Sequence, residues 1–168
     1  MRLTFRRMTD RRPVETRVER DDGVVFEMRG AGGGADLPHD LVHALVEQEL
    51  QVPDGIWGCV ADGVVWHSMR HVTGRQPPHA AERSAALKRE RGSRIQQAEQ
   101  LADVVGRLAR GAEVLPAEVA GSGHPAARLD AAAAALRVAQ RSWAALPPGE
   151  TLVLEWAGPG RRSRRQGP

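Results

Sequence analysis

Alternating apolar and polar residues predict β-strands at both ends of the chain. We expect strands at residues 4–7, 14–20, 24–29 and 151–156. The second and third segments are separated by Asp21-Asp22-Gly23, a tight-turn signature that predicts a β-hairpin. In the last segment Leu152, Leu154 and Trp156 share one face, so this strand needs a neighbouring strand and a covering layer of helices.

Between these strands the apolar residues recur at helical spacing. The pattern predicts helices at about 36–51, 80–110 and 125–146. Asp36 and Pro38 suit the start of the first helix, and Gly92 weakens the middle of the second. The pattern predicts an α+β fold, in which the N-terminal strands and the C-terminal strand form an antiparallel sheet and the helical middle packs on one face.

The pattern of residues 57–71 has two interpretations. Val60, Val64, His67 and His71 fall on one helical stripe, which favours a helix. Alternatively, Asp62-Gly63 forms a turn between two shorter elements.

The net positive charge is concentrated at the C-terminal end of the sequence. The 168 residues carry a formal charge of +3, and four arginines lie in the last eight residues. Without them the chain has 20 basic against 21 acidic residues, so the body is about neutral. We expect one domain over residues 1–157 and a disordered basic tail over residues 158–168. Weak nucleic-acid contact is expected only through the tail arginines.

The same composition limits the location and the chemistry. No stretch of about 20 apolar residues exists, and charged residues interrupt the start of the chain, so we expect a cytoplasmic protein without membrane contact. Cys59 is the only cysteine, which excludes a disulfide or a cysteine-based zinc site within one chain. Any metal would therefore be held by His, Asp and Glu.

The segment His39-Asp40-Leu41-Val42-His43 carries the most specific chemistry in the sequence. Histidines four residues apart project from successive turns of one helix face, where both can bind one tetrahedral metal ion. We expect both imidazoles to point toward the margin of the core, with Asp40 and Glu47 flanking them on the polar side.

This segment resembles the HExxH helix of zincin metallopeptidases. Asp40 stands where that family has its general-base glutamate, and it is one methylene shorter. The wider stretch from Leu37 to His43, LPHDLVH, with Trp57-Gly58 downstream, is also similar to an uncharacterised bacterial family. The second resemblance implies a shared fold and no known activity.

Three other residues are candidates for completing a metal site. His67 and His71 repeat the four-residue spacing, and two facing pairs could hold an ion with one open position. Glu47 is a weaker candidate because it lies roughly 12 Å along the helix axis from His39.

These residues predict a zinc or similar divalent metal, and hydrolytic chemistry in which Asp40 or Glu47 accepts a proton from a bound water. Two alternatives stay open for the segment itself: His39 and His43 could be structural, capping the helix and filling the core, or they could perform acid–base chemistry without metal. A rival function for the whole chain is a non-enzymatic module that binds a protein or nucleic acid.

Overall fold

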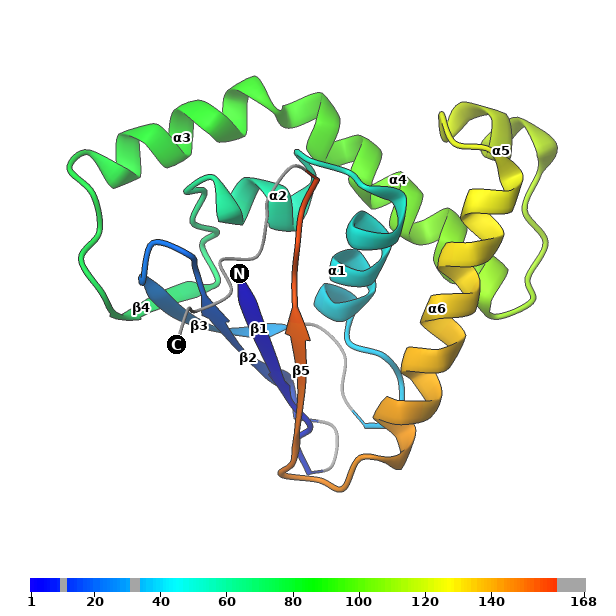
Figure 1. The fold of residues 1–168 in the computed structure, drawn as a ribbon, viewed down its shortest axis with the longest axis horizontal. Coiled ribbons are helices and arrows are strands. Elements are labelled where there is room, and N and C mark those ends of the chain that lie inside the picture. Colours follow the sequence, from blue (N-terminus) through cyan, green and yellow to red (C-terminus); the bar gives the residue numbers. More distant parts are fainter. Residues whose placement is uncertain (10–11, 31–33, 160–168) are drawn as a thin grey trace, which may run out of the picture.

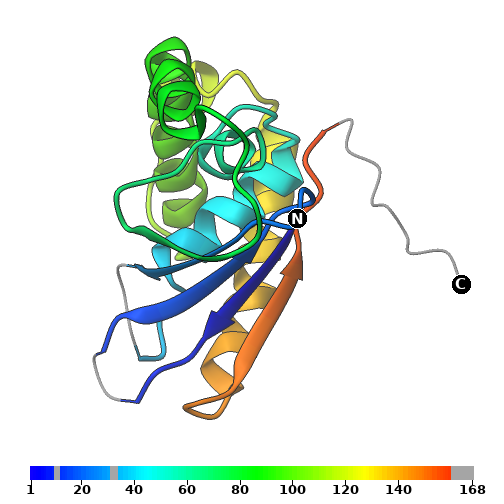
Figure 2. The ribbon, with the colours of Figure 1, turned by 90° about the vertical axis from the view of Figure 1, so that its left-hand side faces the viewer.

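The computed structural model describes residues 1–9, 12–30 and 34–159. It is an α+β fold, as predicted, with the helices on one side of a sheet (Figures 1 and 2). Its elements in chain order are β1 (Arg2–Arg6), β2 (Val14–Glu19), β3 (Val25–Gly30), α1 (His39–Leu50), α2 (Ile56–Ala61), β4 (Met69–Thr73), α3 (Ala80–Glu90), α4 (Gly92–Ala109), α5 (Pro116–Gly121), α6 (Ala126–Ala145) and β5 (Thr151–Glu155).

Within the described residues five strands form one antiparallel sheet in the order β4-β3-β2-β1-β5. The prediction that the C-terminal strand returns to the N-terminal ones is confirmed. β5 pairs with β1, and Leu154 and Leu152 lie opposite Leu3 and Phe5. This pairing places the first and last strands side by side.

The structure decides between the two interpretations of residues 57–71. The single helical stripe is wrong: α2 ends at Ala61, Gly63 adopts a left-handed conformation with φ of 111°, and β4 follows. β4 forms because its backbone pairs with β3, a partner that local periodicity does not reveal. As a result His67 lies in a loop and His71 in a strand.

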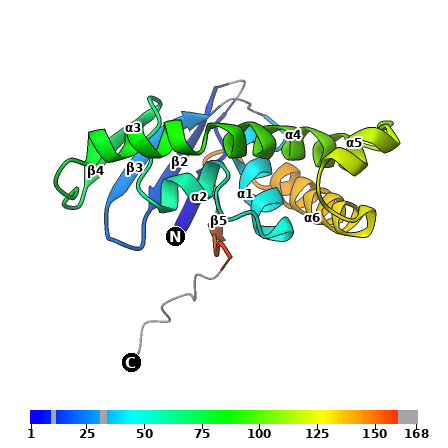
Figure 3. The same ribbon diagram turned by 90° about the horizontal axis from the view of Figure 1, so that it is seen from above.

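The predicted long helix at 80–110 is two helices. α3 and α4 meet at Arg91, next to the Gly92 that weakens the helical pattern, and they run end to end across the molecule (Figure 3). α5 was not predicted from the sequence. None of the helices in the described ranges has both the length and the apolar character needed to cross a membrane.

α1 contributes to both hydrophobic clusters of the core. Leu41 and Ala44 pack with the inner face of the sheet and with Trp57 of α2. Val46 and Leu50 pack with residues of α4 and α6. Because neighbours surround α1 on several sides, its polar residues meet side chains from other elements.

The predicted basic tail lies mostly outside the described residues, which end at Pro159. Gly158 is buried, and a Cβ added to it would lie 2.5 Å from the Trp156 ring. The packed chain therefore extends slightly beyond the predicted boundary at residue 157.

Candidate metal centre

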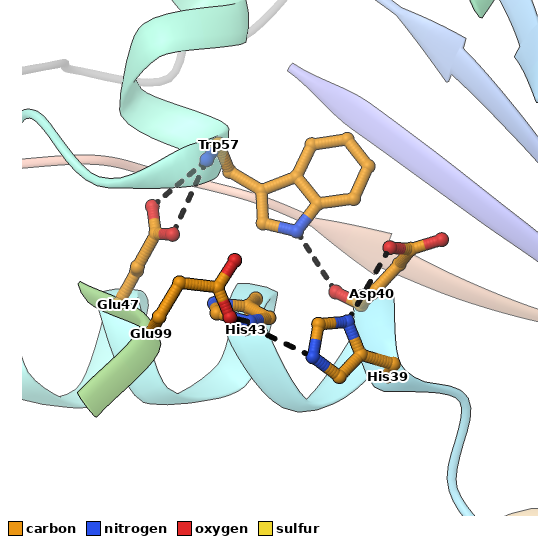
Figure 4. A network of polar contacts seen from close by, with 6 residues as sticks. All are labelled: His39, Asp40, His43, Glu47, Trp57 and Glu99. Atoms are coloured by element: carbon orange, nitrogen blue, oxygen red, sulfur yellow. Dashed lines mark hydrogen bonds and ion pairs between the residues drawn. The ribbon is translucent and has the colours of Figure 1, made fainter. Parts of the chain in front are cut away.

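The two histidines of α1 lie on one helix face, as their spacing predicts. α1 begins at His39, directly after Pro38, and no side chain caps it, so Asp36 does not have the predicted capping role. The ring centroids of His39 and His43 are 4.5 Å apart, with the rings at 63° to each other. Figure 4 shows both imidazoles from the side of α4.

The two imidazoles differ in exposure. The side chain of His43 is 2% exposed, whereas that of His39 is 55% exposed. Only His43 therefore lies within the core, and His39 stands at its edge. Together they form a site that is buried on one side and open on the other.

Glu99 of α4 completes a group of three metal-ligating residues. Its Oε2 atom lies 3.1 Å from Nε2 of His43 and 3.8 Å from Nε2 of His39 (Figure 4). One potential ligand atom from each of these three residues lies within 4.8 Å of the others. The packing of α4 beside α1 thus supplies a carboxylate to the histidine pair.

Asp40 stands behind His39 and contacts its other ring nitrogen. Oδ1 of Asp40 is 3.9 Å from Nδ1 of His39, and the Asp40 carboxylate raises the pKa of His39 above its ordinary value. Gly30 of β3 lies against the same carboxylate, since a Cβ on Gly30 would be 2.1 Å from Oδ2. The side chain of Asp40 is accordingly only 16% exposed. The Asp40 carboxylate favours the orientation of the imidazole in which Nε2 of His39 faces Glu99.

Burial lowers the pKa of His43 below its ordinary value, and the neighbouring Glu99 only partly opposes this effect. At neutral pH His43 is therefore a neutral imidazole, and its Nε2 faces the Glu99 carboxylate at 3.1 Å. A neutral imidazole is the form that binds metal ions.

Glu47 is buried, so the prediction that it lies on a polar face is wrong. It is 1% exposed, and its carboxylate oxygens accept hydrogen bonds from the backbone N–H groups of Trp57 at 3.0 and 3.2 Å and of Gly58 at 3.2 Å (Figure 4). These donors belong to the first turn of α2, where N–H groups lack partners within the helix. Gly55 leaves room for the carboxylate, since a Cβ there would lie 2.6 Å from its carbon. Glu47 therefore anchors α2 to α1.

The surroundings of Glu47 predict a pH-dependent stability. Burial raises the pKa of Glu47 from 4.5 to about 7, although the N–H groups of Gly58 and Trp57 oppose the shift. The folded protein thus holds a proton that the unfolded chain releases near pH 4.5. This contribution to stability is complete below pH 4.5 and is lost as the pH rises to 7, by up to about 3 kcal/mol.

The measurement is chemical denaturation of the chelator-treated protein between pH 4.5 and 8, for the wild type and Glu47→Gln. The two proteins differ only at position 47, so the difference between the two curves isolates Glu47. We expect the wild type to lose stability relative to the variant as the pH rises. A constant difference would contradict the assignment.

A pocket of about 230 Å³ opens beside the three residues. His67, Trp66 and Ser68 line it together with His39, His43 and Glu99. His71 contributes no atom to the three-residue group, because its ring packs edge-on against Phe26 and its Nε2 lies 2.9 Å from the carbonyl of Gly74. Of the second histidine pair, only His67 reaches the pocket.

The sequence does not indicate Glu99 as a ligand, because acidic and basic residues are interleaved between Glu82 and Glu99, a pattern typical of a solvated helix face. One signal was present. Glu99 lies four residues after the apolar Ile95 and next to the buried Ala98, so it borders the inner face of its helix.

Comparisons of the chain with protein-family models, curated proteins and solved structures found no match. The resemblance of LPHDLVH to an uncharacterised bacterial family stays a prediction, as does the likeness to the zincin helix.

Proposed function

We propose that this protein binds a divalent metal ion of the zinc class through His39, His43 and Glu99. The observation that carries the proposal is that three ligand atoms of suitable type lie within 4.8 Å of one another. Two histidines and one glutamate form a common ligand set of catalytic zinc sites, in which the fourth position is left to water or substrate.

The distances suit this assignment. Ligand atoms about 2.0–2.2 Å from a tetrahedral zinc ion lie about 3.3–3.6 Å from one another. The separations of 3.1 Å and 3.8 Å from Glu99 to the two imidazoles bracket this range.

The surroundings of the ligands support the same proposal. The Asp40 carboxylate near Nδ1 of His39 matches the carboxylate–histidine arrangement that orients metal ligands. When bound with one position open, a zinc ion lowers the pKa of a water to near 7, which is the basis of hydrolytic chemistry. The adjoining pocket, which His67 also lines, gives a small substrate access to the ligands. Glu47 is not available as a base, because its oxygens are bound to α2.

The test is zinc titration of the chelator-treated protein by calorimetry, with elemental analysis of the protein purified without chelator. We expect about one ion per chain in the wild type and none in the His39→Ala/His43→Ala double variant. The matched control is His79→Asn, which removes an exposed imidazole outside the site while asparagine tolerates the left-handed backbone at φ of 55°. Circular dichroism checks folding. Absence of zinc in the wild type, or full binding by the double variant, would overturn the proposal.

A further inference from the structure

A second hollow lies between the end of α4, the second half of α6 and the segment leading into α1. This groove of about 620 Å³ shares no lining residue with the pocket of the metal centre. Leu37, Val42 and Leu136 contribute apolar surface to it, and Arg110, Arg137 and Arg141 line it as well. We call it the arginine groove.

The charges of the arginine groove are not balanced. Asp36 is the single acid among the described residues that line it. No described carboxylate forms an ion pair with Arg110, Arg137 or Arg141, whereas Arg107 in the last turn of α4 is paired with Glu118. The arginine groove therefore presents positive charge above an apolar floor.

Helix stability alone does not account for this arrangement. Arg137 and Arg141 lie one turn apart on α6, where like charges cost roughly 0.2–0.5 kcal/mol. Arg110 follows the last turn of α4, where a cation is favourable, and its guanidinium extends back toward Gly106. On α6, Arg137 donates a hydrogen bond from Nη1 to the carbonyl oxygen of Leu108 at 3.4 Å, whereas Arg141 has no hydrogen-bond or ion-pair partner among the described residues.

We propose that the arginine groove docks an acidic peptide segment of a partner protein. Carboxylates of the segment would bind the three guanidinium groups, whose planar donors match a carboxylate, and an apolar side chain would contact the floor. The volume exceeds what a single carboxylate needs and suits a short stretch of peptide. Recognition of acidic motifs by clustered arginines is an established mode of peptide binding.

Nucleic acid fits the arginine groove less well. Its affinity comes from many phosphate contacts along a basic surface, whereas this surface offers three arginines around apolar side chains. On the open face of the sheet Arg17 and Arg70 are paired with Glu27 and Arg29 with Glu15, so the charges of these three arginines are neutralised. The charge pattern thus favours a peptide that is both acidic and apolar.

The test is fluorescence polarisation with the full chain and a short fluorescein-labelled peptide of glutamate, leucine and serine. We expect Arg137→Glu/Arg141→Glu to weaken binding at least about 10-fold. The control Arg75→Glu/Arg89→Glu changes the net charge equally at exposed sites outside the arginine groove and should change binding less than about 2-fold. Peptides with glutamine for glutamate, or with serine for leucine, should each bind more weakly. Because every variant keeps the basic tail, its contribution is the same throughout.

A second measurement uses the wild type alone. Addition of the peptide should shift the backbone amide resonances of Gly106 and Ala109, because both residues line the arginine groove. The proposal is overturned if the wild type does not bind, if the two double variants lose affinity equally, or if the shifts are confined to the tail. Displacement of the peptide by a single-stranded oligonucleotide as readily as by unlabelled peptide would also overturn it, because it would indicate a general polyanion surface.

Discussion

Replacing Glu47 by alanine is expected to lower the free energy of unfolding by about 3–5 kcal/mol. The carboxylate accepts hydrogen bonds from the N–H groups of Trp57 and Gly58, all of them buried. Without it, two buried donors lose their partner, and each unsatisfied donor costs about 1–3 kcal/mol. The cavity left by the side chain adds to this cost.

The loss would be a large part of a total stability of about 5–15 kcal/mol. α2 contributes Trp57 to the core, where this side chain is 1% exposed and its ring centroid lies 6.4 Å from that of Phe5 in β1. Release of α2 would therefore also loosen the hydrophobic cluster between α1, α2 and the sheet. Chemical denaturation followed by tryptophan fluorescence measures the change.

The control is Glu49→Ala, which removes an exposed glutamate from the same helix and should change stability by less than about 0.5 kcal/mol. Glu47→Gln keeps the shape and one acceptor oxygen, so it should fold even if the alanine variant does not. Equal stabilities for Glu47→Ala and Glu49→Ala would contradict the anchoring role.

Glu99→Gln is expected to weaken zinc binding by at least about 100-fold while leaving folding nearly unchanged. The substitution removes the one negatively charged ligand and keeps the size of the side chain, and a neutral amide oxygen is a much poorer ligand for zinc. Loss of an outer-shell partner already costs roughly 10- to 100-fold in metal affinity, so loss of a direct ligand should cost more. The Glu99 side chain is 50% exposed, which explains the small expected effect on stability.

Calorimetric titration with zinc measures the affinity. Glu113→Gln, which removes an equal charge from an exposed position away from the site, should bind zinc like the wild type. If Glu99→Gln also bound zinc like the wild type, the third ligand would not be Glu99, although the histidine pair could still be tested separately by the double histidine variant.

Local patterns in the sequence determined four of the five strands of the described residues, and the histidine pair. Alternation along Thr151–Glu155 requires a paired strand, and the four-residue spacing of His39 and His43 places both on one face of any helix that contains them. Both predictions depend only on backbone geometry that repeats within a few residues, so they do not require knowledge of contacts between distant segments.

Only the tertiary structure decided which residues join that pair and which do not. Glu99 is 56 residues from His43 in sequence and reaches it because α4 packs beside α1. Glu47 was expected on a polar face but is buried, because the N–H groups in the first turn of α2 donate hydrogen bonds to its carboxylate. His71 is held away from the site because β4 pairs with β3. Each outcome depends on a contact between distant segments, and helix or strand periodicity carries no information about such contacts.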